Sequence, residues 1–135
     1  MKNYMAVLLL LSMVTLSAFQ CKKEAVSAKK TCYKGRLEIK GTCLNFTIKI
    51  LEGKISSEKI EKTWKDESTG KEYTNVFRLD NFCTFPPTLK EGEEFYFEIE
   101  ENPSNDCFRC LAFYPVPSKG LNIRVLSGAC SDKTE

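Results

Sequence analysis

Two cysteines have a spacing that could support redox chemistry. Cys107 and Cys110 are separated by Phe108 and Arg109, and such a C-x-x-C pair is the active element of thioredoxin-like oxidoreductases. The pair works when one thiol lies at a helix N-terminus, where the helix dipole lowers its pKa, within a βαβ unit. The surrounding sequence has neither pattern. We therefore favour a structural role for both sulfurs and keep a thiol oxidoreductase as an alternative function.

Other catalytic or metal-binding centres find little support in the composition. The chain of 135 residues contains no His, which excludes His-dependent triads and mixed Cys/His zinc sites. Zinc bound by Cys alone would need a second close pair of cysteines. Carboxylates crowd one segment: Glu91, Glu93, Glu94, Glu98, Glu100 and Glu101. We interpret them as a solvated strand face, because a small domain offers little room for a glycosidase cleft. We expect a protein that is not an enzyme and has no metal and no cofactor.

The first twenty residues have the organisation of an export signal. Lys2 is followed by an apolar run at residues 6–19, which is shorter than the roughly 20 residues of a membrane-spanning helix. A basic start, a short apolar stretch and small residues near its end are typical of a secretory signal. The run leads through Ala18, Phe19 and Gln20 directly into Cys21.

This segment resembles the precursor of a bacterial outer-membrane lipoprotein of the signal peptidase II type, with a relaxed lipobox that ends at Cys21. The resemblance implies that diacylglycerol is attached to the Cys21 thiol and that cleavage makes Cys21 the first residue of the mature chain. Its new amino group is then acylated, typically with palmitate. Lys22, in place of the Asp that retains such proteins in the inner membrane, favours the outer membrane. The alternative is an ordinary signal cut near Ala18.

The chain therefore divides into a signal peptide at residues 1–20, a lipidated tether at 21–31 and a single domain at 32–135, which resembles small cysteine-rich lipoproteins. Seven cysteines in so short a chain indicate an oxidising compartment, and setting Cys21 aside leaves an even number that can pair completely. The disulfide candidates are Cys32, Cys43, Cys83, Cys107, Cys110 and Cys130. Spacing alone cannot choose among their pairings, and a bridge between Cys43 and Cys83 is our preferred one.

The domain is patterned as short β-strands. Residues 44–50 alternate between apolar and polar side chains, which is typical of a half-buried strand, and residues 36–39 form the other arm of a hairpin. Residues 52–66 fit either a short helix capped by Ser57 or a strand at 63–65 that turns into a strand at 72–79, and we prefer this second hairpin. Residues 95–99 and 121–125 add two more strands. The pattern predicts a mainly β fold, a small antiparallel β-barrel or sandwich (OB-like) with at most one short helix, stabilised by disulfides.

Several aromatic side chains lie in or beside loops that contain proline: Phe82, Phe85, Phe108, Phe113 and Tyr114. They form either an exposed binding patch or apolar plugs at the open ends of a small barrel. We favour the plugs, but the same loops are where a binding patch would lie.

These observations favour a binding protein over an enzyme. We expect a membrane-anchored lipoprotein of the cell envelope, on the periplasmic or the surface face of the outer membrane, that acts as a non-catalytic binding or structural module. Its partners would be the membrane, through the lipid anchor, and an envelope protein or glycan. The formal net charge of +2 argues against nucleic acid as a partner. A small envelope inhibitor of a protease or a lysozyme is the alternative, because a rigid bridged scaffold loses little entropy on binding.

Overall fold

The computed structural model describes residues 31–104, 106–108, 110 and 112–130. These residues form seven β-strands: β1 (Cys32–Gly41), β2 (Asn45–Glu52), β3 (Glu61–Lys65), β4 (Glu72–Leu79), β5 (Glu94–Ile99), β6 (Gly120–Leu121) and β7 (Ile123–Val125). Two single turns of 3-10 helix, at Thr42–Leu44 and Phe82–Thr84, are the only helical pieces in this part of the chain. The predicted mainly β fold is confirmed.

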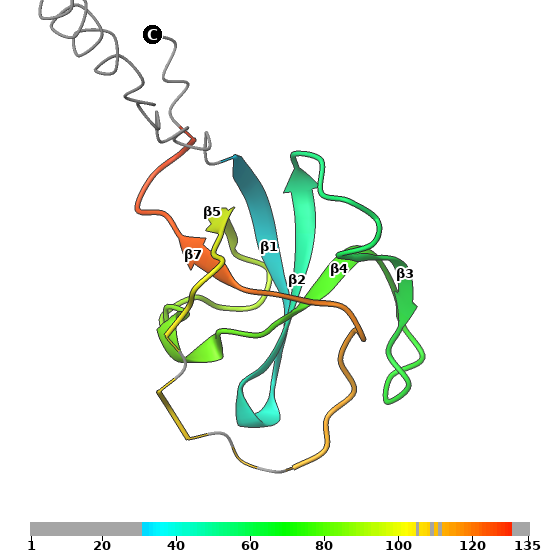
Figure 1. Ribbon diagram of the computed structural model, residues 1–135. Helices are drawn as coiled ribbons and strands as arrows, with labels where there is room; N and C mark the ends of the chain where they lie inside the picture. Colours follow the sequence, from blue (N-terminus) through cyan, green and yellow to red (C-terminus); the bar gives the residue numbers. More distant parts are fainter. Residues whose placement is uncertain (1–30, 105, 109, 111, 131–135) are drawn as a thin grey trace, which may run out of the picture.

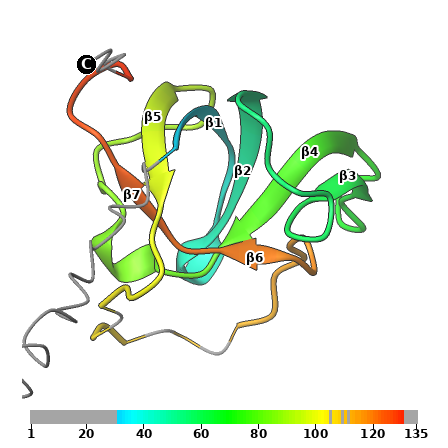
Figure 2. The same ribbon diagram turned by 45° about the horizontal axis from the view of Figure 1, so that its top comes forward.

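The strands form one sheet in the order β3-β4-β2-β1-β5-β7, and all neighbours along this path are antiparallel (Figure 1). The short β6 pairs in parallel with β4, whereas β7, one residue further on, pairs with β5 (Figure 2). The segment 120–125 therefore contacts the two outer strands of the β4-β2-β1-β5 series, β4 through β6 and β5 through β7. The predicted barrel needs correction, because no residue of this segment pairs with both neighbours and the sheet is not closed.

The interior of the sheet is filled by aromatic rings around Phe97. The Phe97 ring lies 5.4 Å from that of Tyr33, 6.0 Å from Phe77 and 5.9 Å from Phe95, measured between ring centroids. Gly35 in β1 makes room for this cluster, since a Cβ at that position would lie 2.9 Å from the Phe97 ring. Burial of such rings supplies most of the free energy that holds a small domain together.

The β3–β4 hairpin confirms the preferred interpretation of residues 61–79 over a helix. Trp64 and Tyr73 lie opposite each other in the hairpin and stack with their ring centroids 5.7 Å apart. Further along β4, the consecutive residues Val76 and Phe77 are both fully buried. Side chains of consecutive strand residues point to opposite faces, so both faces of the sheet are covered at this point.

A buried amide holds the end of the sheet together where the strand pairing changes. The Asn81 side chain, 1% exposed, donates a hydrogen bond to the Ile123 carbonyl (2.7 Å) and accepts one from the Ile123 N–H (2.8 Å). It thereby satisfies both backbone groups of a residue at the start of β7, next to the change of partner from β4 to β5. Without these bonds two backbone groups would be buried unpaired.

We expect Asn81→Ala to destabilise the domain by about 3 kcal/mol, because each unpaired buried backbone group costs about 1–3 kcal/mol. Urea unfolding of the oxidised protein, followed by Trp64 fluorescence, measures the free energy of unfolding. The exposed Asn102→Ala is the matched control and should stay within about 0.5 kcal/mol of the parent. Equal effects of the two changes would show that the Asn81 amide does not hold β7.

Candidate functional site

The connection between β5 and β6 is the most unusual part of the described chain. It spans residues 100–119 and forms no strand or helix where it is described. Connections longer than about 12–15 residues without secondary structure are uncommon in compact domains, and they are usually functional or disordered. Here covalent and polar contacts hold the segment against the sheet, and we call it the stapled loop.

Two disulfide bridges fasten the first half of the stapled loop. Cys110 is bonded to Cys43 in the β1–β2 turn, with the two Cα atoms 5.4 Å apart, and Cys107 is bonded to Cys83 in the Phe82–Thr84 turn, at 5.5 Å. The Cys107 N–H also donates to the Cys83 Sγ at 3.2 Å. The third bridge, Cys32–Cys130, ties the start of β1 to the end of the described chain.

These bridges correct the predicted pairing. The preferred Cys43–Cys83 bridge is wrong, because the stapled loop passes beside both turns and takes one sulfur from each. Cys107 and Cys110 are bonded to different partners and not to each other.

The second half of the stapled loop is bound to the outer face of the sheet at Arg78. Cross-strand neighbours share a face, which places Ile39, Thr47 and Arg78 in one row on this side. The Arg78 guanidinium donates to the Pro117 and Ser118 carbonyls of the loop, at 3.4 and 3.1 Å. Thr47, in the middle of this row, is fully buried.

Tyr114 packs where the loop crosses the β1–β2 hairpin. A Cβ added to Gly41 would lie 2.6 Å from the Tyr114 ring, so only glycine leaves room for the ring at this point. Burial raises the pKa of the Tyr114 hydroxyl, and the nearby carboxylates of Asp66 and Glu91 act in the same direction. The hydroxyl is therefore neutral at physiological pH and serves packing.

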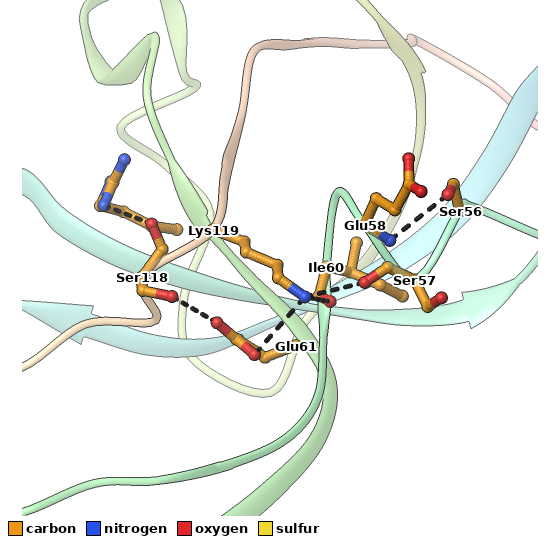
Figure 3. Close-up of polar contacts among 8 residues, drawn as sticks. Ser56, Ser57, Glu58, Ile60, Glu61, Ser118 and Lys119 are labelled. Carbon is orange, nitrogen blue, oxygen red and sulfur yellow. Dashed lines mark hydrogen bonds and ion pairs between the residues drawn. The ribbon is translucent and has the colours of Figure 1, made fainter.

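The far end of the stapled loop is locked to the segment before β3. Figure 3 shows the Lys119 side chain reaching between two backbone carbonyls, those of Ser57 (2.8 Å) and Ile60 (3.0 Å), with the Glu61 carboxylate beside it. The Ser118 hydroxyl donates to the same carboxylate. The loop is therefore fixed near its middle by covalent bonds and at its far end by charge-assisted hydrogen bonds.

Two phenyl rings stand out from this fixed loop. Phe108 is 90% exposed and Phe113 is 89% exposed. The other three residues of the predicted patch behave differently. Phe85 is 6% exposed and packs between Phe46 and Phe95, Phe82 packs against the core, and Tyr114 is half-buried on Gly41. The favoured interpretation as apolar plugs therefore fits Phe82 and Phe85, which pack in or against the core, and is wrong for Phe108 and Phe113, which are exposed.

The charged groups near the loop have structural partners. Burial alone would raise the pKa of Asp66, but hydrogen bonds from the backbone and hydroxyl of Ser68 and from the Thr69 hydroxyl outweigh it and lower that pKa. These bonds close the β3–β4 turn. Within the described ranges, no group of His, Cys, Asp and Glu side chains could hold a metal ion, and no helix is long and apolar enough to cross a membrane. Cys21 and the rest of the tether up to residue 30 lie outside the described residues.

Sequence reasoning missed two residues of this region. Asn81 looked like part of a loop, and no local pattern marks a side chain that will pair with a strand 42 positions away. Leu44 looked like the first buried residue of a strand, yet it is 37% exposed at the tip of the β1–β2 turn.

Comparison with known proteins gives no match: none of the family models, curated proteins or solved structures searched resembles the chain.

We expect the lowered pKa of Asp66 to appear in the pH dependence of stability. A carboxylate with a depressed folded-state pKa stabilises the fold above its unfolded value, near 3.8, and this stabilisation is lost as the pH falls through the folded-state pKa. Asp66→Asn should therefore be less stable at pH 7 and lose less stability between pH 4 and pH 2 (about the range set by the unfolded pKa). Urea unfolding at a series of pH values measures this. The exposed Asp106→Asn is the control, and parallel curves for Asp66→Asn and the parent would contradict the assignment.

Proposed function

We propose that this protein is a membrane-anchored lipoprotein of the cell envelope, and that its β-domain is a non-catalytic binding module that engages its partner through Phe108 and Phe113. The observation that carries the proposal is the exposure of these two rings, 90% and 89%, on a loop that two disulfides and several hydrogen bonds hold in place.

Binding through these rings is supported by the energetics of the free and bound states. Burying a phenyl side chain against an apolar partner contributes about 1.5–3 kcal/mol, and exposed apolar clusters mark interaction sites. A loop that is already ordered loses little conformational entropy when it binds. The stapled loop thus combines large apolar side chains with a low entropic cost of association, and it needs no catalytic group to do so.

The anchor is supported by the cysteine count together with the N-terminal sequence. Every cysteine after Cys21 is used in one of the three bridges, which leaves Cys21 as the thiol for lipidation. Disulfides form in oxidising compartments, which agrees with export to the periplasmic or surface face of the outer membrane. Two or more acyl chains anchor a protein stably, since each buried CH₂ contributes about 0.8 kcal/mol.

A second candidate is an inhibitor of a protease or a lysozyme in the envelope. It is favoured by the same rigid loop, since a preorganised loop can enter an enzyme's cleft and remain bound. The thiol oxidoreductase is not carried further, because Cys107 and Cys110 belong to different bridges.

The double change Phe108→Ser with Phe113→Ser should abolish partner binding and leave stability within about 0.5 kcal/mol of the parent, because both rings are solvated in the free protein. The parent protein and the double variant are each immobilised and incubated with solubilised envelope proteins. The proteins that each one retains are compared by gel electrophoresis. The change Lys62→Ser with Lys65→Ser, at two exposed residues of β3, is the control. Identical retention by all three proteins would remove the support for binding through the loop. Inhibition of lysozymes and proteases, measured with the same proteins, distinguishes the second candidate.

The anchor predicts a mass shift on Cys21. Full-length protein extracted from membranes should carry diacylglycerol and an amide-linked acyl chain on a mature chain that begins at Cys21, and it should react with no alkylating agent unless it is reduced first. Intact-mass spectrometry with and without reductant and iodoacetamide measures both properties. Cys21→Ser should leave the protein unacylated and free of the membrane. An unacylated parent protein with a free Cys21 thiol would refute the anchor.

A further inference from the structure

The tip of the β1–β2 hairpin has a backbone conformation that its residues do not favour. Cys43 has φ 62° and ψ 36°, Leu44 has φ 60°, and the Asn45 N–H donates to the Thr42 carbonyl. This is the geometry of a type I′ turn, in which Asn-Gly is the preferred central pair because both residues need positive φ. A residue with a side chain in this region costs roughly 1–2 kcal/mol relative to glycine.

The disulfide bridge to Cys110 explains why a cysteine stands at position 43, but it does not explain the leucine at position 44. Cys43 must be a cysteine to form the bridge to Cys110. Leu44 is absent from the buried core and is 37% exposed, so packing does not repay its backbone strain. Strained positions that the fold does not require are found at functional sites. The exposed leucine side chain itself is therefore the feature that needs a reason.

Leu44 lies where the exposed rings are. It follows Cys43, whose partner Cys110 lies in sequence between Phe108 and Phe113, and Gly41 on the other side of the turn contacts Tyr114. Within the described part of the chain, Leu44, Phe108 and Phe113 are the large hydrophobic side chains that remain exposed. Along the chain, Leu44 is next to Cys43, and Phe108 and Phe113 lie on either side of Cys110, so all three are near the Cys43–Cys110 bridge in sequence.

We infer that Leu44, Phe108 and Phe113 form one docking surface, and that its partner is a folded envelope protein with an apolar cleft. This inference rests on the proposed function and specifies the partner of the same site.

The position of the surface relative to the tether favours a protein partner over the membrane in which the domain is anchored. The tether enters at Cys32, the first residue of β1, whereas the docking surface lies beyond the last residue of that strand (Figure 1). A strand of ten residues spans about 33 Å at 3.3 Å per residue. An anchored domain can therefore present Leu44, Phe108 and Phe113 on the side away from the bilayer. Phenyl and isobutyl groups are apolar, and the fully buried core of a protein interface is its most apolar part.

The test separates the side chain of Leu44 from its backbone strain. Full-length lipoprotein with p-benzoylphenylalanine in place of Phe113 is expressed in the cells that make it and irradiated, and the yield of the protein adduct is measured. Leu44→Gly should raise the thermal midpoint by about 5 °C, because it relieves the strain. It should also lower the adduct yield by about tenfold, because it removes an apolar anchor. A variant that becomes more stable while it loses binding cannot be explained by misfolding.

Two further variants at position 44 are matched controls. Leu44→Ala keeps the strain and loses most of the side chain, so it should lose the adduct with no gain in stability. Leu44→Met keeps both the strain and an apolar side chain, so it should resemble the parent in both measurements. The inference is supported by this combination of stability and adduct yield across the three variants, and not by the capture of a protein alone.

The outcomes distinguish this inference from the proposed function. An adduct yield unchanged by Leu44→Gly but lost in Phe108→Ser would overturn the role of Leu44 and leave binding through the loop standing. An adduct yield unchanged by Leu44→Gly and by Phe108→Ser would overturn both the role of Leu44 and binding through the loop. Flotation of the unacylated domain with vesicles that contain phosphatidylglycerol, or an adduct with phospholipid, would overturn a protein partner.

Discussion

The bridge between Cys43 and Cys110 is the constraint on which the arrangement of the candidate site depends. It joins the tip of the first hairpin to the middle of a long loop that has no hydrogen-bonded ladder of its own. The two cysteines are 67 positions apart, so the bridge removes a large number of conformations from the unfolded chain and contributes about 4 kcal/mol by chain entropy. It also fixes where the loop crosses the hairpin, and thereby the positions from which Phe108 and Phe113 project.

The remaining contacts of the loop fix its second half against the sheet. Arg78 and Lys119 bind backbone carbonyls of the loop and of its neighbours, and the Tyr114 ring packs on Gly41 of the first hairpin. On the outer face of the sheet, the Thr47 hydroxyl is left as the unpartnered buried side-chain oxygen of the described residues, which costs free energy of folding.

Much of the sheet could be predicted because the information is local. The alternation in β2 and the turn at Asp66–Gly70 specify a half-buried strand and a hairpin without reference to the rest of the chain. The disulfide pairing could not be predicted, because it depends on which loop passes beside which turn. Phe85 and Phe108 illustrate the same limit. Both residues lie within two positions of a cysteine in a loop. Phe85 nevertheless packs between Phe46 and Phe95, whereas Phe108 is exposed to solvent. Exposure of a loop aromatic is decided by tertiary packing, and the pairing of Asn81 with Ile123 is likewise visible only in three dimensions.

The central claim, that two separate bridges hold the loop that presents Phe108 and Phe113, is tested most directly by a peptide map of the mature protein digested with trypsin without reduction. Trypsin cuts after Arg109, so Cys107 and Cys110 fall in different peptides and their partners can be identified separately. The structure predicts that the Cys110 peptide is linked to the Cys43 peptide, and the Cys107 peptide to the Cys83 peptide. A peptide pair that links Cys107 to Cys110, or Cys43 to Cys83, would contradict the account and return the C-x-x-C pair to consideration as a redox site.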